Sequence, residues 1–198
     1  MMPYAVSISL LQYAALVLGG LLFGAAVFAK RLRTPKSDTP AAALSRLSIV
    51  GIAIQTLGFF IASIGRVHVD TPAFSARSIV LSAIVLALGV AGALLFDRSA
   101  KVLGANWSLV ARMRSDHGLV RDGPFAHVRH PIYLAMLLLL VAVGLGLGHL
   151  VGLLAGIPFF VIGTAIRIRE EERLLRMQFG AAHELYARET PAFIPKIF

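Results

Sequence analysis

Cysteine is absent from the 198-residue sequence, and acidic residues are few, with ten Asp and Glu against 19 Lys and Arg. The absence of cysteine excludes disulfides, thiolate metal sites and catalysis by a thiol. The formal charge of +9 is compatible with a nucleic-acid partner, but the basic residues lie mainly in loops between apolar runs. No basic face studded with aromatic side chains is visible, so we do not expect nucleic-acid binding.

Apolar residues dominate the sequence. The hydrophobic fraction is 58% and the mean hydropathy is +0.80, both above the values usual for a soluble domain. We therefore predict an all-α integral membrane protein that forms a single membrane domain over residues 1–198. Apolar runs predict about five transmembrane helices, although the last two are near the short limit for a span. The runs are Tyr4–Ala29, Leu44–Ile64, Ala76–Phe96, Ile132 to about Leu147, and Leu150–Ile168.

Lysine and arginine are distributed unevenly among the predicted loops. They are concentrated at residues 30–46, at residues 101–129 and from residue 167 onward, and they are sparse near residues 66 and 148. Because cytoplasmic loops are enriched in these residues, we expect the N-terminus outside and the C-terminus in the cytoplasm. Residues 1–97 then hold three helices. Residues 98–198 hold an interfacial loop, a helical hairpin and a C-terminal helix, which together form the cofactor-binding part.

Three further features carry structural predictions. Gly20 and Gly24 form a small-xxx-small pair that permits close helix contact. Gln55 is the strongly polar side chain inside the second run, and we expect it to hydrogen-bond a neighbouring helix. Trp107, within the polar stretch Lys101–Asp122, suits an anchor at the membrane interface.

The first polar motif is Gly123-Pro-Phe-Ala-His-Val-Arg-His-Pro-Ile-Tyr133, at the start of an apolar run. A helix is predicted to begin near Pro131, because proline suits the first turn and disfavours helical geometry in the preceding residue. His130 and Tyr133 then lie on roughly one face, beside the positive end of the helix dipole. This arrangement predicts an anion site. The alternative is that Arg129 and His130 anchor the helix at lipid headgroups and Tyr133 belongs to an aromatic belt.

The second polar motif is Arg167-Ile-Arg-Glu-Glu-Glu172, which is predicted to continue the last helix beyond the membrane. One interpretation is an exposed helix with charge pairs, since Glu172 and Arg176 are four residues apart. The position of Arg167 argues against it, because the residue lies within a turn of the hydrophobic span. A buried guanidinium needs an anionic partner, which could be a substrate.

Together, the two motifs resemble the isoprenylcysteine carboxyl methyltransferase family, a branch of membrane methyltransferases that also includes phospholipid N-methyltransferases. The resemblance covers roughly residues 106–195 and joins Arg-His-Pro-x-Tyr to Glu-Glu-x-x-Leu and Phe-Gly across a helical hairpin. The residues that carry it are Leu119-Val120, Gly123-Pro124, Val128-Arg129-His130-Pro131, Tyr133, Glu171-Glu172, Leu175, Phe179-Gly180, Tyr186 and Phe193-Ile194-Pro195.

The resemblance implies that S-adenosyl-L-methionine is held by the cytoplasmic C-terminal region without a Rossmann domain. The implied cofactor contacts are His130, Tyr133, Glu171 and Glu172, with Val120 and Pro131 lining the cleft. The implied catalytic residues are Arg129 and Arg167, which orient an anionic acceptor, and Glu172. The charges suit these roles, because carboxylates bind amino or ribose groups and arginines bind carboxylates. The resemblance implies a lipophilic or prenylated acceptor that enters from membrane lipid, and no obligate protein partner is evident.

The chain departs from the family pattern at three places. Phe125-Ala126-His127 replaces a common Tyr-Arg-Tyr, His183 stands where tyrosine is usual, and Ala192 replaces a common basic residue. These changes bear on the acceptor more than on the cofactor. They leave the two polar motifs intact.

Other functions fit parts of the pattern. A phospholipid amine is the nearest alternative acceptor. An NADPH-dependent reductase is another possibility, because sterol reductases resemble the family in their C-terminal helices, and it requires a pocket for the extra ribose phosphate. In a non-catalytic membrane protein, Arg129, His130 and Glu172 would be interfacial charges. His127 and His130 lack further ligands at suitable spacing, so we expect no metal site.

Overall fold

The computed structural model describes residues 5–33, 43–106, 112–113 and 118–193. Trp107 and the final Ile194-Pro195 of the family-like pattern lie outside these residues. The helices are α1 (Leu10–Arg33), α2 (Arg46–Ser63), α3 (Ala76–Leu103), α4 (Pro131–Gly146), α5 (Leu150–Phe179) and α6 (Ala181–Glu189). Two short 3-10 helices are η1 (Gly104–Asn106) and η2 (Gly123–Ala126).

Four of the described helices, α1, α2, α3 and α5, are long and apolar enough to cross a membrane. The chain is therefore a multi-pass membrane protein. α4 is also apolar, but it has only 16 residues, so the structure supports four of the five predicted spans by length. The predicted hairpin of α4 and α5 is present, and α5 continues through the charged motif to Phe179 as expected.

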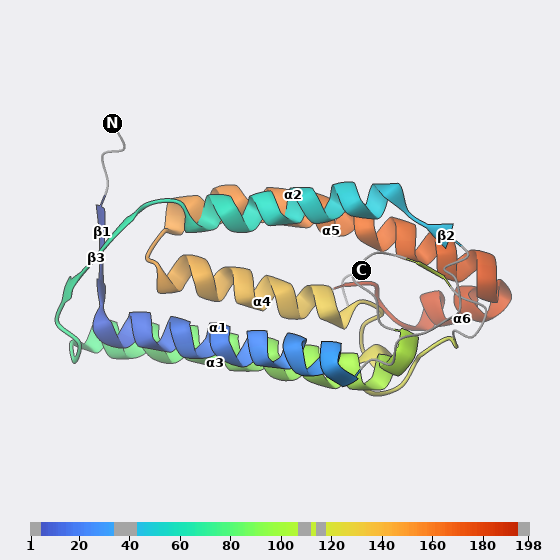
Figure 1. Ribbon diagram of the computed structural model, residues 1–198, viewed down its shortest axis with the longest axis horizontal. Coiled ribbons are helices and arrows are strands. Elements are labelled where there is room, and N and C mark those ends of the chain that lie inside the picture. Colours follow the sequence, from blue (N-terminus) through green and yellow to red (C-terminus); the bar gives the residue numbers. More distant parts are fainter. Residues whose placement is uncertain (1–4, 34–42, 107–111, 114–117, 194–198) are drawn as a thin grey trace.

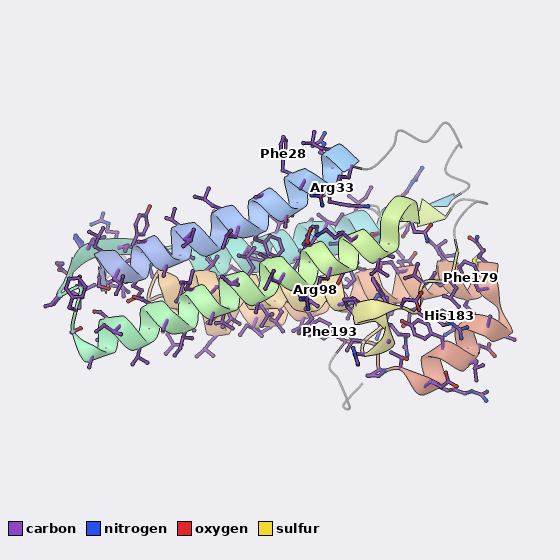
Figure 2. All side chains as sticks on the ribbon, turned by 90° about the horizontal axis from the view of Figure 1, so that it is seen from below. Phe28, Arg33, Arg98, Phe179, His183 and Phe193 are labelled. Carbon is purple, nitrogen blue, oxygen red and sulfur yellow. The ribbon has the colours of Figure 1, made fainter. Side chains whose placement is uncertain are left out.

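The long helices form two pairs with α4 between them (Figure 1). α1 lies along α3, and α2 lies along α5. Large apolar side chains cover the outside of the bundle, including Leu21 and Leu32, which are 66% and 70% exposed. Phe28 also points away from the bundle (Figure 2). Such a surface suits lipid as its solvent.

Glycines allow the paired helices to approach closely. A Cβ added at Gly58 in α2 would lie 2.8 Å from the carbonyl oxygen of Gly156 in α5. The prediction that Gly20 and Gly24 make such a contact is wrong, because nothing lies within 4 Å of a Cβ at either position. Gly19 makes it instead, since a Cβ there would lie 3.1 Å from the Cα of Gly89. Successive residues of a helix are rotated by about 100° about its axis, so Gly20 points to a different face of α1 than Gly19 does.

The predicted hydrogen bond from Gln55 to a neighbouring helix is confirmed. Its side-chain Nε2 donates to Thr164 Oγ1 in α5 over 2.6 Å, and its Oε1 accepts from Arg167 Nη1, also over 2.6 Å. Gln55 and Thr164 are both buried. This polar contact fixes the register of α2 against α5 and orients a guanidinium at the deep end of the charged motif.

Two short strands change the prediction for the first apolar run. Residues Ala5–Ser9 form β1, which pairs in parallel with β3 (Arg66–Thr71), so the first helix begins at Leu10 rather than at Tyr4. Val6 and Ile8 alternate with serines, which is a strand period. Ser9 then accepts a hydrogen bond from the backbone N–H of Gln12 and caps α1.

A second small sheet pairs β2 (Ala43–Leu44) with β4 (Arg112–Met113) in antiparallel fashion. The fold is therefore mainly helical rather than strictly all-α. β1 and β3 lie at the end of the bundle opposite to α6 (Figure 1).

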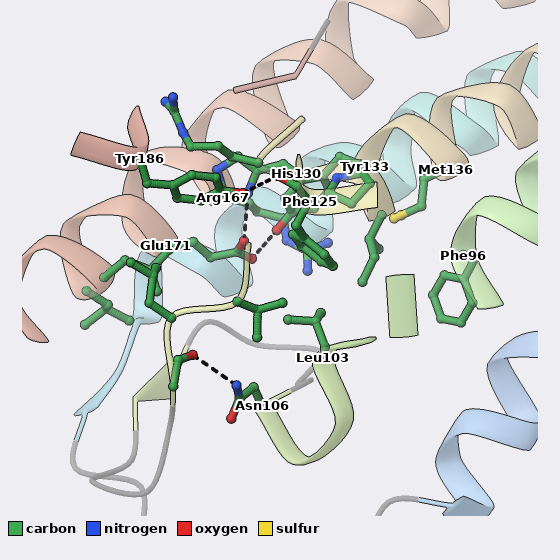
Figure 3. Close-up of a pocket in the computed structure, with 18 of the residues that line it drawn as sticks. Phe96, Leu103, Asn106, Phe125, His130, Tyr133, Met136, Arg167, Glu171 and Tyr186 are labelled. Carbon is green, nitrogen blue, oxygen red and sulfur yellow. Dashed lines mark hydrogen bonds and ion pairs between the residues drawn. The ribbon is translucent and has the colours of Figure 1, made fainter. Parts of the chain in front are cut away.

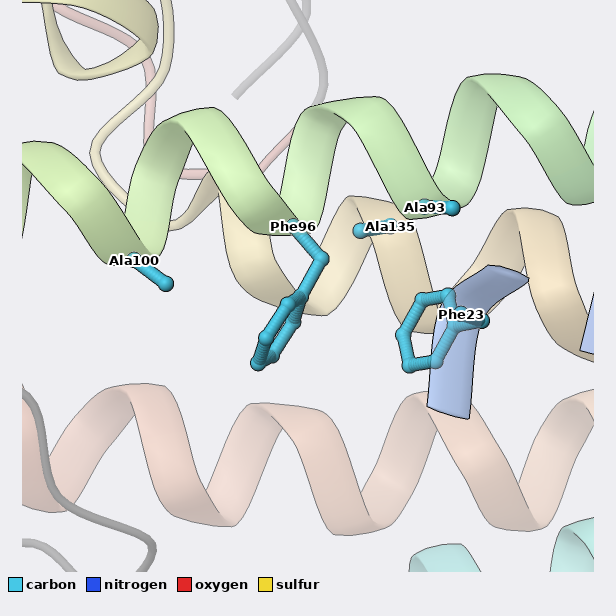
Figure 4. Packing of buried hydrophobic residues seen from close by; sticks show 5 residues of the cluster. All are labelled: Phe23, Ala93, Phe96, Ala100 and Ala135. Carbon is cyan, nitrogen blue, oxygen red and sulfur yellow. The ribbon is translucent and has the colours of Figure 1, made fainter. Parts of the chain in front are cut away.

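An aromatic pair fills the space between α1, α3 and α4. The rings of Phe23 and Phe96 have centroids 5.3 Å apart and an interplanar angle of 47°. Ala93, Ala100 and Ala135 surround them in the buried cluster, and their small side chains leave room for the two rings (Figure 4). This cluster lies directly beside the pocket described below, which Phe23 and Phe96 also line.

Candidate active site

The first polar motif lies where η2 leads into α4. Pro131 is the first residue of α4 and His130 is its N-cap, which confirms the predicted helix start. The backbone N–H groups of Arg129 and His130 donate to the carbonyls of Pro191 and Ala192, each over 2.9 Å. The segment after α6 therefore holds this motif in place through the backbone.

His130 lies between two carboxylates of the second motif. Its Nδ1 is 3.3 Å from Glu171 Oε2, and its Nε2 is 3.2 Å from Glu172 Oε1. Burial acts to lower the pKa of His130, but hydrogen bonds and charge from Glu171 and Glu172 raise it above its usual value. The imidazole thus favours its protonated form and connects the start of α4 to α5.

Arg129 is tied to three segments of the chain. Its Nε and Nη2 lie 2.8 Å and 2.7 Å from Glu172 Oε1. Its Nη1 donates to the carbonyl of Ala187 over 2.8 Å and to that of Thr190. Four of the five N–H groups of the guanidinium are therefore engaged within the protein.

A third group of contacts joins Tyr133, Glu171 and Arg167. The Tyr133 hydroxyl donates to Glu171 Oε1, and the Arg167 guanidinium carbon lies 4.8 Å from the centroid of the Tyr133 ring. Arg167 is only 5% exposed and donates to Gln55. The interpretation of this motif as an exposed helix with charge pairs is therefore wrong for Arg167, Glu171 and Glu172, whose side chains meet the start of α4. It holds for the pair of Glu170 with the exposed Arg173, which are 3.1 Å apart.

These side chains form one wall of a pocket of about 410 Å³ at the α6 end of the bundle (Figure 3). The polar wall contains Arg129, His130, Tyr133, Arg167 and Glu171. The rest of the lining is largely apolar and includes Phe23, Val27, Phe96, Leu103 and Met136. Every residue that the resemblance assigned to the site lines the pocket except Glu172, including Val120 and Pro131. Glu172 is not part of the pocket lining, and its carboxylate instead contacts Arg129 and His130.

Comparison with known proteins places this pocket in a family context. Residues 83–177 match the model of the isoprenylcysteine carboxyl methyltransferase (ICMT) family. The resemblance to the ICMT family is confirmed. Its matched residues run from α3 to near the end of α5 and include both polar motifs. α6 lies beyond the matched residues.

Three curated relatives match parts of the chain. The cobalt-zinc-cadmium resistance protein CzcN of Cupriavidus metallidurans is 34% identical over 122 residues, which is 59% of this chain and 52% of that protein. The protein-S-isoprenylcysteine O-methyltransferase of Schizosaccharomyces pombe is 33% identical over 89 residues, 45% of this chain and 38% of that protein. The nickel-cobalt-cadmium resistance protein NccN of Alcaligenes xylosoxydans xylosoxydans is 29% identical over 119 residues, 59% of this chain and 53% of that protein. The matches thus span about half the length of these relatives or less.

Several pocket residues were not singled out from the sequence. Phe23, Val27 and Arg31 of α1 line the pocket and are spaced four residues apart, which places them on one helix face. The four-residue spacing could have shown that these residues share a helix face. The neighbouring sequence does not show what that face contacts. They lie outside the ICMT-matched residues 83–177.

α6 contributes Tyr186 and His183, three residues apart, to the same pocket. The Tyr186 hydroxyl donates to the carbonyl of Phe125 over 2.6 Å, and Arg121 lies over its ring at 5.4 Å. Burial raises the pKa of Tyr186 to about 12, so its phenol stays protonated and can keep donating. Tyr186 thereby fixes η2 against α6 at the edge of the pocket.

Metal-ligating groups are sparse in the described part of the chain. Among those residues there is no group of three or more His, Cys, Asp or Glu side chains arranged to hold a metal ion. The histidine and the two glutamates of the site are engaged with each other, Arg129 and Tyr133.

Proposed function

We propose that this protein transfers a methyl group from S-adenosylmethionine to a lipophilic acceptor. The ICMT match supports a methyltransferase. The observation that carries the proposal is the mixed lining of the pocket, which holds Glu171 and Arg167 together with apolar side chains such as Phe23 and Met136. A methyltransferase of lipids needs such a combination, because a polar cofactor and an apolar acceptor must meet at one place.

The residues of the pocket suit S-adenosylmethionine. A volume of about 410 Å³ falls within the range of small-molecule sites. Glu171 offers a carboxylate to the amino or hydroxyl groups of the cofactor, while Tyr133 and His130 hold that carboxylate in position. The cofactor, when bound, supplies an electrophilic methyl group. Val120 and Pro131 line the cleft around it.

Arg129 and Glu172 act as positioning residues in this proposal. Arg129 has four of its N–H groups engaged, and Glu172 lies outside the pocket lining and bonds both Arg129 and His130. Their contacts fix the start of α4 against α5. This assignment differs from the resemblance, which implied that both make direct contacts.

Arg167 is the residue that we propose to orient the acceptor. It is buried at the pocket wall, and its guanidinium lies against Tyr133. A carboxylate acceptor is already ionised near neutral pH, so no general base is needed. Arginine would align it, while the apolar wall that includes Phe23 and Val27 excludes water and accommodates an isoprenoid-like chain. The acceptor class is thus an isoprenylcysteine-like carboxylate.

The pocket end of the bundle is proposed to face the cytoplasm. The last turns of α1 and α3, which carry Arg33 and Lys101, lie at this end, as the positive-inside tendency requires (Figure 1). The pocket draws on α1 and α3 as well as on α4 and α5, so both halves of the chain, 1–97 and 98–198, form one functional unit in this proposal.

The test is methyl transfer by the purified protein in lipid nanodiscs, with S-adenosylmethionine labelled in its methyl group. The acceptors are N-acetyl-S-farnesylcysteine, its carboxamide, and phosphatidylethanolamine. We expect base-labile label on the free carboxylate and none on the carboxamide. Base-stable label on phosphatidylethanolamine would instead support an amine acceptor. Absence of transfer to all three acceptors by folded protein would contradict the proposed carboxylate acceptor and leave only cofactor binding to support methyl transfer.

A further inference from the structure

His183 is a buried side chain of the pocket to which neither the resemblance nor the proposed mechanism gives a role. It lies in α6, is 0% exposed and lines the cavity. Both of its ring nitrogens are buried without a hydrogen-bond partner. The family resemblance gives tyrosine as the usual residue here, so the imidazole is a feature of this chain.

The imidazole of His183 offers two hydrogen-bonding positions. Burial lowers its pKa below the usual value, which favours the neutral ring. A neutral imidazole donates from one nitrogen and accepts at the other. Buried polar atoms in folded proteins nearly always have partners, so an occupant of the pocket is the natural source of partners for these two nitrogens.

His149 provides a contrast within the same chain. It is also buried, and its two ring nitrogens also lack partners. It packs against Gly65 at the strand end, where a Cβ on Gly65 would lie 2.5 Å from His149 Nε2, and it does not line the pocket. The cavity beside His183 is therefore what distinguishes the two histidines.

The surroundings of His183 indicate which part of a ligand it would meet. The pocket lining contains the aromatic side chains Phe125, Phe179 and Tyr186. Tyr186 lies one turn after His183 on α6, and its hydroxyl donates to the carbonyl of Phe125. Figure 2 shows His183 and Phe179 at the α6 end of the bundle. Flat aromatic rings suit a planar base by stacking, and a base edge presents both acceptors and donors. The carboxylate of Glu171 remains for the more polar part of the ligand.

We infer that His183 binds the adenine base of S-adenosylmethionine through its edge nitrogens. This inference rests on the proposed function and extends it, because it assigns the adenine end of the cofactor to α6. It places the sulfonium end nearer Glu171, Tyr133 and His130. The aromatic and the charged parts of the lining then bind different parts of one molecule.

The test is calorimetric binding of S-adenosylhomocysteine and its 1-deaza, 3-deaza and 7-deaza adenine analogues to the full-length protein. We expect the wild-type protein to bind at least one deaza analogue about tenfold more weakly than the parent compound. His183→Phe should bind the parent about tenfold more weakly and no longer discriminate against that analogue. His183→Gln, which keeps a donor and an acceptor, should restore part of the discrimination.

His149→Phe is the matched control, because it removes the other buried, unpartnered imidazole. We expect it to leave the affinity and the discrimination unchanged. Equal discrimination by the wild-type protein and both His183 variants would overturn the inference. If the wild-type protein binds no S-adenosylhomocysteine, the proposed function itself fails, and that outcome is distinct from loss of discrimination.

Discussion

The two ends of the bundle treat polar groups differently. At the strand end, polar side chains mostly bond backbone carbonyls, as Gln12 does with those of Leu145 and Gly146 over 2.8 Å and 3.3 Å. At the α6 end, charged side chains from distant segments bond one another around a cavity, with Glu171 and Arg167 on its wall.

This difference distinguishes polar side chains that hold the helices together from polar side chains that we propose to bind a ligand. The strand end secures the connections between helices, and Gln12 there reaches its partners without a ligand, whereas the ring nitrogens of His149 remain unpartnered. The α6 end concentrates charge where burial makes it costly, and such charges in membrane proteins commonly mark a ligand site. Changes at the first end should alter stability alone, whereas changes at the second should also alter ligand binding.

The largest effect is expected from Arg129→Ala. It removes four hydrogen bonds and leaves Glu172 with His130 alone, so we expect a loss of about 3 kcal/mol, as for a broken buried ion pair. The midpoint of thermal unfolding should fall by about 6–12 °C. The control is Arg173→Ala, whose side chain is 55% exposed in its pair with Glu170 and should cost less than about 1 kcal/mol. Equal shifts in the two variants would show that Arg129 is not a link between segments.

The next effect concerns binding. Glu171→Gln should weaken S-adenosylmethionine binding by about 100-fold, because the cofactor loses a charged partner on the pocket wall. Glu170→Gln makes the same chemical change one residue earlier, where the carboxylate bonds Ser45 and Arg173 instead. We expect that variant to keep its affinity in the same calorimetric titration. Equal weakening by both variants would contradict the proposal that Glu171, and not Glu170, contacts the cofactor.

These two predictions concern parts of the site that could be predicted from the sequence. Pro131 fixed the start of α4, and the continuous helical pattern carried Glu171 and Glu172 onto α5. Gln55 was the polar side chain of an apolar run and could be expected to find a neighbour. Each of these features is a local pattern with a local cause.

Other features depend on tertiary packing and could not be predicted from local sequence patterns. β1 is continuous in composition with α1, and its partner β3 lies some 60 residues away, so only the pairing reveals it. The face of α1 that carries Phe23 and Val27 meets the pocket because α1 packs against α3 and α4. The choice of Gly19 over Gly20 likewise depends on the rotation of one helix against another.

Gln12→Leu tests the strand end and should have a smaller effect. It removes the two hydrogen bonds to the last residues of α4, for a loss of about 1 kcal/mol in unfolding free energy. Tyr13→Phe, at a neighbouring side chain that is 44% exposed, should be neutral. Affinity for S-adenosylmethionine should be the same in both variants. A weaker affinity in Gln12→Leu would contradict the proposal that changes at the strand end alter stability without altering ligand binding.

The smallest effect is a pH dependence from His130. Its pKa is raised in the folded protein, so its stabilising contribution is complete below its usual pKa and is lost as the pH rises through the raised pKa. The unfolding midpoint should therefore fall as the pH rises over this range. His130→Asn should lose this part of the dependence. A midpoint that rises with pH, or the same fall in both proteins, would contradict the role of His130 between Glu171 and Glu172.

The most direct test of the account is calorimetric binding of S-adenosylmethionine to the protein in lipid nanodiscs, with NADPH titrated in parallel. We predict micromolar binding of S-adenosylmethionine to the wild-type protein and about 100-fold weaker binding to folded Glu171→Gln. NADPH should not bind. Failure of the folded wild-type protein to bind S-adenosylmethionine, or selective binding of NADPH, would contradict the proposal that the α6 end is a methyltransferase site.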